Sequence, residues 1–396
     1  MTWPLSQRIQ SFQPSATVSI SNLAAQMTAD GKDVINLAVG EPDFDTPAHI
    51  IEAATLAMQT GQTRYTQVGG TQSLRQAICA KYTRENQLSY KPAQVLVSNG
   101  AKQSIYNLTV ALLEAGDEVI IPAPFWVSYS AMVTMAGATP VVVHCPAQQH
   151  FKLTPEQLAA AITPATKLIM FNSPSNPSGQ AYTGPEWLAL GRVIRRHPRL
   201  VVLSDDIYEH IYWAKAPLSG LLNECPDLAD RCVLVNGVSK AYAMTGWRIG
   251  YAVGPTNIIN AMTKVQVESS SCASSISQAA AEAALSGPQS LLQPMLTAYQ
   301  QRHNYVVAQL SSIPGLSVLP SQGTFYTFPN CQQAIERLGY EDDVALVKAI
   351  LSHTGVALVP GSAFGMAGHF RLSYATDVAL LTTACERLTK FFEVTA

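Results

Sequence analysis

The chain has 396 residues, of which 47% are hydrophobic and 13% are charged, and its formal net charge at pH 7 is −2. This length favours two domains over one, and the small net charge argues against a nucleic acid or a membrane surface as partner. The first four residues lack the pattern of a signal peptide, and no apolar stretch is long enough to span a bilayer. Seven scattered cysteines without a C-x-x-C pair and eight histidines without ligand spacing predict reduced thiols, a cytoplasmic location and no metal site.

The N-terminal residues are expected to form an arm and then a helix, with small apolar residues at helical spacing from Ser19 to Met27. A short strand at 34–37 leads into a Gly-Glu-Pro-Asp turn that begins at Gly40. A helix is expected next, at 48–59. Tyr65 follows in a polar stretch, where a tyrosine could simply be exposed in a turn.

The middle of the chain alternates apolar runs with helical or loop segments. Strands are expected at 95–97, 118–121, 141–144, 168–172, 200–204, 232–236 and 249–253. Continuous apolar runs mixed with helices predict an α/β fold with a mostly parallel sheet covered on both faces. The sequence contains no G-x-G-x-x-G, so a dinucleotide-binding version of this fold lacks its fingerprint.

Beyond about residue 290 the pattern changes to helices, Pro/Gly turns and short strands. These strands are expected at 316–319, 324–328, 356–359 and 370–373. We expect a large domain of residues 47–290 and a smaller α+β domain of residues 291–396, completed by residues 1–46.

Lys240 comes shortly after the apolar strand at 232–236, beyond the carboxyl end of that strand. In open α/β sheets ligands bind in the crevice at this edge. Apolar surroundings would lower the pKa of the lysine and suit it to Schiff-base chemistry with a carbonyl. Taken alone, a lysine is more often solvated, so the interpretation depends on its neighbours.

Polar and aromatic side chains follow other strands. Trp126 lies after a Pro-x-Pro turn, and Asn176 lies in a loop restrained by two prolines. Asp205 directly follows an apolar strand, where a carboxylate is costly unless it is paired. The strand–glycine–helix pattern at Gly100 presents backbone N–H groups to an anion. Arg371 within an apolar strand likewise needs an anion, and its planar guanidinium matches a carboxylate.

The stretch 236–251, with its Ser-Lys pair and its Met-Thr-Gly-Trp-Arg-Ile-Gly-Tyr ending, resembles the lysine motif of the class I aminotransferases. These are fold-type I pyridoxal-phosphate enzymes. The resemblance continues in the right order from Pro14 to Ala375. It includes the Gly-Glu-Pro-Asp turn, the Asn-Pro-x-Gly loop at Asn176 and the Phe-Arg-Leu-Ser-Tyr-Ala strand. It implies a large domain with a mostly parallel seven-stranded sheet, a smaller α+β domain, and ping-pong transamination with pyridoxal 5'-phosphate.

The resemblance also implies residue roles. Lys240 would join the cofactor and move the substrate α-proton, Asp205 would pair with the pyridine nitrogen, and Tyr208 would hydrogen-bond the ring oxygen. The residues expected to hold the cofactor are Lys240, Gly100, Ala101, Lys102, Trp126, Asn176, Asp205, Tyr208, Ser239, Arg248 and, across a dimer interface, Tyr65. The residues expected to contact the substrate are Gly40, Trp126, Asn176, Arg371, Lys102, Ser15 and Thr17. The family's usual Asp-Glu pair is Asp-Asp here, but the change falls at Asp206, outside the pyridine contact.

In the subgroup that this chain resembles, a lysine and hydroxyls meet the distal carboxylate of aspartate, and Lys102, Ser15 and Thr17 match those positions. We therefore expect aspartate and 2-oxoglutarate as substrates of a homodimer. Aromatic amino acids, alanine, kynurenine and prephenate or arogenate remain alternatives, although Gln13 stands where prephenate-accepting members carry a lysine. A carbon–sulfur lyase of this fold fits the motifs less well. A regulator would need a DNA-binding module for which the N-terminal arm has no room.

Overall fold

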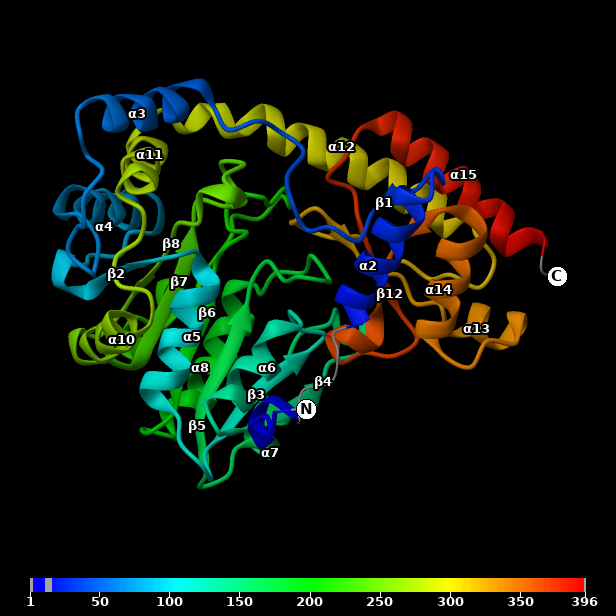
Figure 1. Ribbon diagram of the computed structural model, residues 1–396. Helices are drawn as coiled ribbons and strands as arrows, with labels where there is room; N and C mark the ends of the chain where they lie inside the picture. The colour runs from blue at the N-terminus through cyan, green and yellow to red at the C-terminus, as the bar shows by residue number, and fades with distance from the viewer. Residues whose placement is uncertain (1–2, 11–15, 395–396) are drawn as a thin grey trace.

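The computed structural model describes residues 3–10 and 16–394, and its main element is a seven-stranded sheet in the order β2-β8-β7-β6-β5-β3-β4 (Figure 1). The strands are β2 Val95–Ser98, β3 Glu118–Ala123, β4 Thr139–His144, β5 Thr166–Asn172, β6 Val201–Asp205, β7 Cys232–Gly237 and β8 Gly250–Val253. Strand β8 is antiparallel to both of its neighbours, and the other pairs are parallel. The prediction of a mostly parallel seven-stranded sheet is confirmed.

The apolar runs form strands because helices cover them. All residues of β2, β7 and β8 are buried. The edge strand β4 is only partly buried, and it contains Pro140, which an edge strand tolerates because one of its sides needs no backbone donor. The helices that follow and flank these strands are α3 Ala48–Gln59, α4 Gln72–Asn86, α5 Ala101–Leu112, α6 Ser128–Met135, α7 Pro155–Ala161, α8 Gly184–Arg195, α9 Leu221–Glu224, α10 Thr256–Ser269 and α11 Ser275–Ser286.

Helix α8 illustrates why these segments are helical. Its first turn has a capping box between Thr183 and Glu186, with a proline inside the turn. Its buried face carries Trp187, Leu190 and Ile194, spaced three and four residues apart. The helix is thus started by a local polar motif and held by burial of one apolar face.

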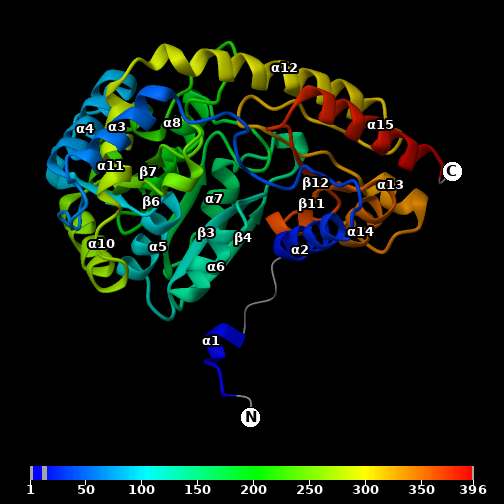
Figure 2. The same cartoon turned by 45° about the horizontal axis from the view of Figure 1, so that its top comes forward.

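A second group of helices with two small sheets lies beside the large sheet (Figures 1 and 2). Its elements are α2 Ala16–Ala29, β1 Ile35–Asn36, α12 Leu292–Ser311, β9 Tyr326–Thr327, α13 Gln332–Leu338, α14 Asp343–Thr354, β10 Val356–Ala357, β11 Val359–Pro360, β12 Phe370–Ser373 and α15 Val378–Val394. Strand β1 pairs in parallel with β10, and β11, β12 and β9 form an antiparallel sheet. The short helix α1 Gln7–Gln10 lies apart from both groups in Figure 2.

The expected strand at 316–319 is wrong. This described segment has no strand, and only Ser317 pairs, in a single bridge with Asn330. Leu316 and Val318 alternate as in a strand, but a turn ends at Gly315 directly before the segment, and Pro320 after it has no backbone N–H to donate to a ladder. The strand expected at 324–328 is also shortened, to the two residues of β9. Among the described residues, no helix has both the length and the apolar character needed to cross a membrane.

Candidate active site

A cavity of about 470 Å³ lies where the carboxyl ends of β5, β6 and β7 face the three-stranded sheet β11-β12-β9 (the smaller sheet). Most of the residues that the sequence singled out line it. These are Gly40, Ala101, Lys102, Trp126, Asn176, Asp205, Tyr208, Ser239, Lys240, Arg248 and Arg371. Four lining side chains are basic and one, Asp205, is acidic. The cavity therefore has the size of a cofactor site and a strong preference for anions.

Lys240 lies in the turn after β7, and its side chain extends into the cavity. Its Nζ donates a hydrogen bond to the carbonyl oxygen of Gly40 at 2.9 Å. Burial lowers the pKa of Lys240 to about 8; the nearby charge of Glu41 opposes this lowering, and Arg248 adds to it. A buried lysine whose pKa lies near neutrality can supply a neutral amine as a nucleophile.

Asp205 is the last residue of β6 and is only 4% exposed. Its Oδ2 accepts a hydrogen bond from the Tyr129 hydroxyl at 2.6 Å, and its Oδ1 accepts one from the Ile207 amide at 3.3 Å. Burial raises the pKa of this carboxyl group to about 6, against the lowering effect of those two hydrogen bonds and of Lys240. A buried carboxylate with only neutral hydrogen-bond partners suits a ligand that brings a cationic N–H group.

Arg371 lies on β12 and is 5% exposed. Its Nη1 donates to Asn176 Oδ1 at 3.0 Å and its Nη2 to the Ala38 carbonyl oxygen at 2.6 Å. Its Nε has no hydrogen-bond partner, and within the described ranges no carboxylate lies within ion-pair distance of the guanidinium. A buried guanidinium without an acidic partner is a strong site for a carboxylate ligand.

The backbone at the start of α5 forms a cradle for an anion. Gly100 precedes the helix with a φ of 85° and has no side chain to cap its first amides. A Cβ atom on Gly100 would lie 2.3 Å from Arg248 Nη2, and one on Gly250 would lie 2.1 Å from the Ala101 nitrogen. Two glycines thus allow an arginine and a second strand to approach the helix start. Free helix amides beside a guanidinium fit a phosphate group.

Lys102 and Trp126 lie on the same wall of the cavity. The Lys102 Nζ is 4.8 Å from the centroid of the Trp126 ring, within range of a cation–π interaction. Burial lowers the pKa of Lys102, and the nearby charge of Arg248 lowers it further. Trp126 is not part of the fully buried core, so its ring is available to stack on a planar ligand.

Among the lining residues that the sequence argument missed, three hydrogen-bond to predicted site residues through their side chains. Tyr129 donates to Asp205 as described, and the hydroxyl groups of Tyr326 and Tyr208 share a hydrogen bond of 3.0 Å. Asn172, at the end of β5, donates through Nδ2 to the Asp205 carbonyl oxygen at 2.8 Å and accepts from the Asn176 amide at 2.7 Å. Asn172 follows an apolar strand, which was an available signal. Tyr129 and Tyr326 lie in α6 and β9, where the sequence gives no such signal.

Other predicted residues are not placed at this cavity. Tyr65 does not line it and is 93% exposed. Ser15 lies outside the described residues, and so does the side chain of Thr17. Asp206 accepts a hydrogen bond from Ser204 Oγ at 2.7 Å and does not line the cavity, which agrees with its expected place outside the ligand contact.

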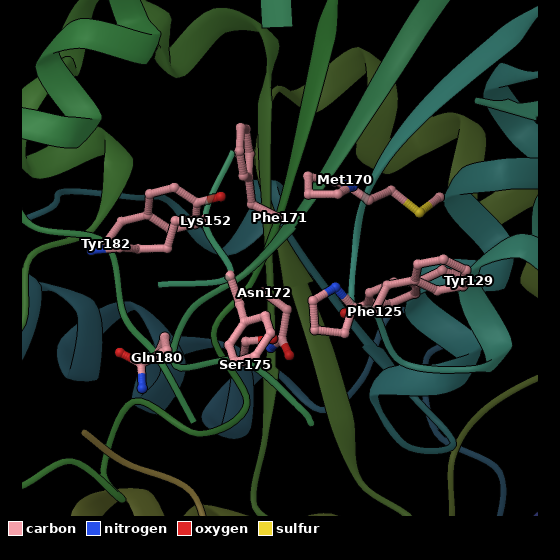
Figure 3. Close-up of a pocket in the computed structure, with 12 residues that line it drawn as sticks. Phe125, Tyr129, Lys152, Met170, Phe171, Asn172, Ser175, Gln180 and Tyr182 are labelled. Carbon is pink, nitrogen blue, oxygen red and sulfur yellow. The ribbon is translucent and has the colours of Figure 1, made fainter. Parts of the chain in front are cut away.

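A second cavity, of about 20 Å³, adjoins the first and shares Tyr129 and Asn172 with it. Figure 3 shows Phe125 and Tyr129 on one side of this cavity and Lys152 and Tyr182 on the other. Its volume corresponds to roughly one water molecule, so it has no room for an amino acid. The chemistry therefore belongs to the larger cavity.

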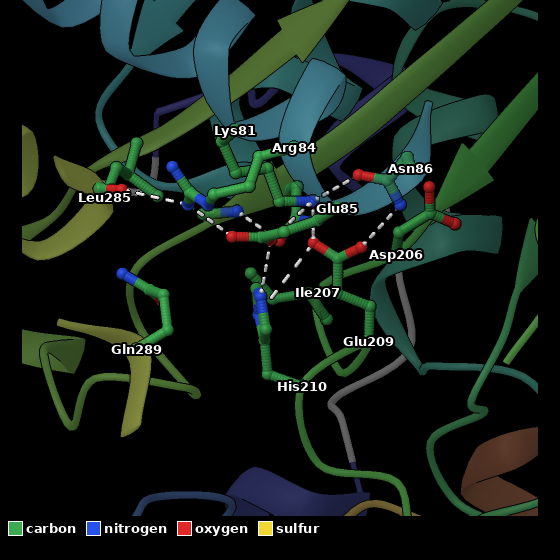
Figure 4. A network of polar contacts seen from close by, with 12 residues as sticks. Lys81, Arg84, Glu85, Asn86, Asp206, Ile207, Glu209, His210, Leu285 and Gln289 are labelled. Atoms are coloured by element: carbon green, nitrogen blue, oxygen red, sulfur yellow. Dashed lines mark hydrogen bonds and ion pairs between the residues drawn. The ribbon is translucent and has the colours of Figure 1, made fainter. Parts of the chain in front are cut away.

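A buried ionic network supports the turn after β6 (Figure 4). Lys81 of α4 is fully buried, forms a close ion pair with Glu209, and donates to Asn86 Oδ1 at 2.8 Å. Asn236 of β7 donates to Glu209 Oε1 at 2.6 Å, and His210 Nε2 lies 2.9 Å from Glu85 Oε2. Because Glu209 follows Tyr208 directly, these contacts fix the turn that presents Tyr208 to the cavity.

Comparison with known proteins gives a consistent family. The model of the family described as aminotransferase class I and II matches residues 32–388. The chain is 49% identical to the aspartate/prephenate aminotransferase of Nitrosomonas europaea, covering 97% of this chain and 98% of that protein. It is 48% identical to the aspartate aminotransferase of Geobacillus stearothermophilus, with 99% and 100% coverage. The solved structure of the Rhizobium meliloti aspartate aminotransferase superposes with a TM-score of 0.95 at 45% identity, covering 98% of each chain.

A lysine beyond a strand end, a buried carboxylate and an anion cradle lie around one cavity, an arrangement that suits an enzyme of amino-group chemistry and agrees with these similarities. The chain belongs to the class I and II aminotransferases. It has the fold of that family, and it is a transaminase.

Proposed function

We propose that this transaminase uses pyridoxal 5'-phosphate to transfer the amino group of L-aspartate to 2-oxoglutarate, giving oxaloacetate and L-glutamate. The observation that carries the proposal is that the side chains of Lys240, Asp205 and Arg371 line one cavity. The names of the relatives support the choice of aspartate, since they are aspartate or aspartate/prephenate aminotransferases.

The residues present fit the cofactor. The glycine cradle at Gly100 with Arg248 suits its phosphate, Asp205 suits its ring nitrogen, and Trp126 suits stacking on its ring. Ser239, Ala101, Lys102, Asn176 and Tyr208 are the further proposed contacts. When bound, pyridoxal phosphate supplies an electron sink for the negative charge that develops at the substrate α-carbon.

Lys240 carries the proton transfer in this proposal. With a pKa of about 8 its Nζ is in part neutral near pH 7, so it can attack a carbonyl and, once released, accept the proton of the substrate α-carbon. The same Nζ later donates that proton. Gly40, whose carbonyl oxygen accepts from Nζ at 2.9 Å, orients it.

Substrate orientation falls to Arg371 and Asn176. The Arg371 guanidinium, which has no acidic partner among the described residues and donates to Asn176 through Nη1, would meet the α-carboxylate, while Lys102 would meet the distal carboxylate of aspartate. Gly40 and Trp126 complete the contacts. Ser15 and Thr17 are the further candidates for the distal carboxylate.

The assembly and the location are part of the proposal. We infer a homodimer with shared sites, in which Tyr65 reaches the partner's cofactor phosphate; its 93% exposure in one chain supports this. We also infer two domains, 47–290 and 291–396 with 1–46, supported by the separate sheets. All seven cysteines are free, which supports a cytoplasmic location.

The test is the absorbance spectrum of the purified protein, loaded with pyridoxal phosphate. Aspartate should bleach the visible band, and 2-oxoglutarate should restore it. A band that aspartate leaves unchanged and phenylalanine, alanine or kynurenine bleaches would keep the enzyme class and reject aspartate. A protein that shows no visible band after addition of the cofactor would contradict the role of Lys240.

Prephenate is the second candidate, because the Nitrosomonas europaea relative is named an aspartate/prephenate aminotransferase. The same experiment addresses it. After aspartate has bleached the band, prephenate is added in place of 2-oxoglutarate. Restoration of the band at a comparable rate would make prephenate an amino acceptor of this enzyme.

A further inference from the structure

Tyr326 is a buried tyrosine of the smaller sheet that lines the large cavity. It belongs to β9 and pairs with Ser373 of β12. Its amide donates to Thr324 Oγ1 at 3.2 Å, and its carbonyl oxygen accepts from Ser321 Oγ at 2.8 Å. The backbone of Tyr326 is held on both sides, so the place of its ring is fixed by the fold.

Three parts of the site meet at this side chain. The Tyr326 hydroxyl lies 3.0 Å from the Tyr208 hydroxyl, and the centroid of its ring lies 4.3 Å from Arg371 Cζ. A Cβ atom on Gly40 would lie 2.2 Å from the Tyr326 hydroxyl, so this hydroxyl passes directly beside the residue whose carbonyl oxygen accepts from Lys240.

We propose that Tyr326 is a positioning residue that acts on both halves of the active site. Its hydroxyl holds Tyr208 in the orientation in which that tyrosine meets the cofactor ring oxygen. Its ring holds the Arg371 guanidinium toward the substrate α-carboxylate. The inference rests on the proposed cofactor and substrate.

The physical basis differs for the two contacts. Tyr208 is buried, and its hydroxyl has one described protein partner, Tyr326, so this bond decides where its hydrogen points. The Arg371 guanidinium is buried without an acidic partner, so the electron-rich face of the Tyr326 ring compensates part of its charge. The Phe364 ring, 5.0 Å from Arg371 Cζ, adds a weaker contact of the same kind.

The contact with Tyr208 also crosses between the two parts of the fold. Tyr208 follows β6 of the large sheet, whereas Tyr326 and Arg371 belong to neighbouring strands of the smaller sheet. A shift of the smaller sheet therefore moves the Arg371 guanidinium and the partner of Tyr208 together. Substrate binding on one side is coupled in this way to the cofactor environment on the other.

The first experiment uses the holoenzyme and Tyr326→Phe, which removes only the hydroxyl. The visible absorbance is titrated with pH. A hydrogen bond donated to the cofactor ring oxygen makes that oxygen a weaker acceptor for the Lys240 Nζ proton. If Tyr208 is no longer well placed to donate this bond, the proton is bound more strongly and the pH midpoint of the titration should rise. We expect this midpoint to rise by roughly 0.5 to 1 pH unit, which corresponds to the free energy of one neutral hydrogen bond.

Tyr208→Phe and the double variant complete a cycle. If Tyr326 acts through Tyr208, adding Tyr326→Phe to Tyr208→Phe should shift the midpoint no further. Tyr340→Phe, a tyrosine between α13 and α14 that does not line the cavity, is the matched control and should leave the midpoint unchanged.

The second experiment measures the affinity of the holoenzyme for succinate, a dicarboxylate without an amino group, from its effect on the visible spectrum. Tyr326→Phe keeps the ring and should change the dissociation constant by less than about twofold. Tyr326→Leu removes the ring and should weaken binding roughly fivefold to thirtyfold, as expected for loss of a desolvated cation–π contact.

The outcomes separate cleanly. A midpoint in Tyr326→Phe within about 0.2 unit of wild type, a fall, or additive shifts in the double variant would overturn the link to Tyr208. Unchanged succinate affinity in folded Tyr326→Leu would overturn the link to Arg371. If Tyr326→Leu does not fold, Phe364→Leu tests the same aromatic support of Arg371 and should weaken succinate binding by a smaller factor. A missing visible band already in the wild-type protein would instead reject the proposed cofactor.

Discussion

At the scale of single residues, Lys240 has two separable properties, its position beside the cavity and its lowered pKa. Replacing it with alanine removes both the proposed nucleophile and the proposed acid–base group. We expect kcat to fall by about 10²- to 10⁴-fold or more, the usual contribution of a positioned acid–base residue. Steady-state assays with aspartate and 2-oxoglutarate measure this. Circular dichroism of the variant checks the fold, and a variant with near-normal turnover would reject the assignment.

The lowered pKa of Lys240 also predicts a pH dependence of stability in the cofactor-free protein. The folded pKa is about 8 against an ordinary value of 10.5, so between these values the unfolded chain binds a proton that the folded chain has lost. The free energy of unfolding therefore rises with pH through this window. Below pH 8 the lowered pKa destabilises the folded protein by its full amount, about 3 kcal/mol.

Lys240→Met should accordingly raise the free energy of unfolding of the cofactor-free protein at pH 7, by up to about 3 kcal/mol, with the gain shrinking between pH 8 and pH 10.5. Urea unfolding at pH 7 and pH 10 measures both values. A gain that is the same at the two pH values would show that packing, and not the charge, is responsible.

The sequence pattern singled out Lys240, Asp205, Asn176 and Arg371, and the family resemblance added Arg248; the side chains of all five line one cavity. Their catalytic roles stay predictions. Tyr129 and Tyr326 were not predicted because no local sequence pattern distinguishes them. Tyr129 belongs to a helix and Tyr326 to a two-residue strand, and both reach the cavity only through tertiary packing. Asn172 could have been found from its place at the end of β5.

At the scale of elements, the junction between β2 and α5 depends on glycine. Gly250→Ala would place a methyl group 2.1 Å from the Ala101 nitrogen, so the start of α5 must move. We expect the affinity for pyridoxal phosphate to fall at least about tenfold, because the helix amides no longer converge on one phosphate. Equilibrium titration by fluorescence measures it. Gly116→Ala is the control: its φ of 97° makes it strained, but no atom lies within 4 Å of the added Cβ.

The network between α4 and the turn after β6 makes a prediction about stability. Lys81→Met leaves Glu209 buried without its cation and should cost about 3–5 kcal/mol, measured by urea unfolding. Arg195→Ala breaks the exposed ion pair with Asp227 and should cost less than about 1 kcal/mol. Similar costs for the two variants would show that the buried network adds little.

The large sheet was predictable strand by strand because most of its strands are continuous apolar runs that are buried on both faces; the edge strand β4 is only partly buried. The smaller sheets were predictable only in part. The segment 316–319 has the alternation of a strand, but only Ser317 pairs, in one bridge. A turn ends at Gly315 directly before the segment, and Pro320 after it has no backbone N–H to donate. Alternation alone predicts which side chains face the core. It does not predict whether another strand pairs with the segment.

At the scale of the whole molecule, the proposed homodimer can be tested by complementation. Tyr65→Ala alone should weaken cofactor binding with the monomer fold unchanged, because the side chain is 93% exposed. Lys240→Ala alone should be inactive. After mixing, partial unfolding and reassociation, heterodimers would contain one site with both native residues and should regain part of the activity. Analytical ultracentrifugation gives the oligomeric state, and an active monomer would contradict the shared site.

The excess of basic side chains around the large cavity has a consequence for how the protein behaves in solution. Lys102, Lys240, Arg248 and Arg371 line the same cavity as a single acid, Asp205. Arg371 and Asp205 are buried, whereas Lys102 and Arg248 are open to solvent. Such a cavity attracts small anions from the buffer by its positive potential. Phosphate, sulfate and chloride are therefore competitors of both cofactor and substrate. The apparent affinities for both will depend on the identity and concentration of the buffer anion as well as on the protein itself.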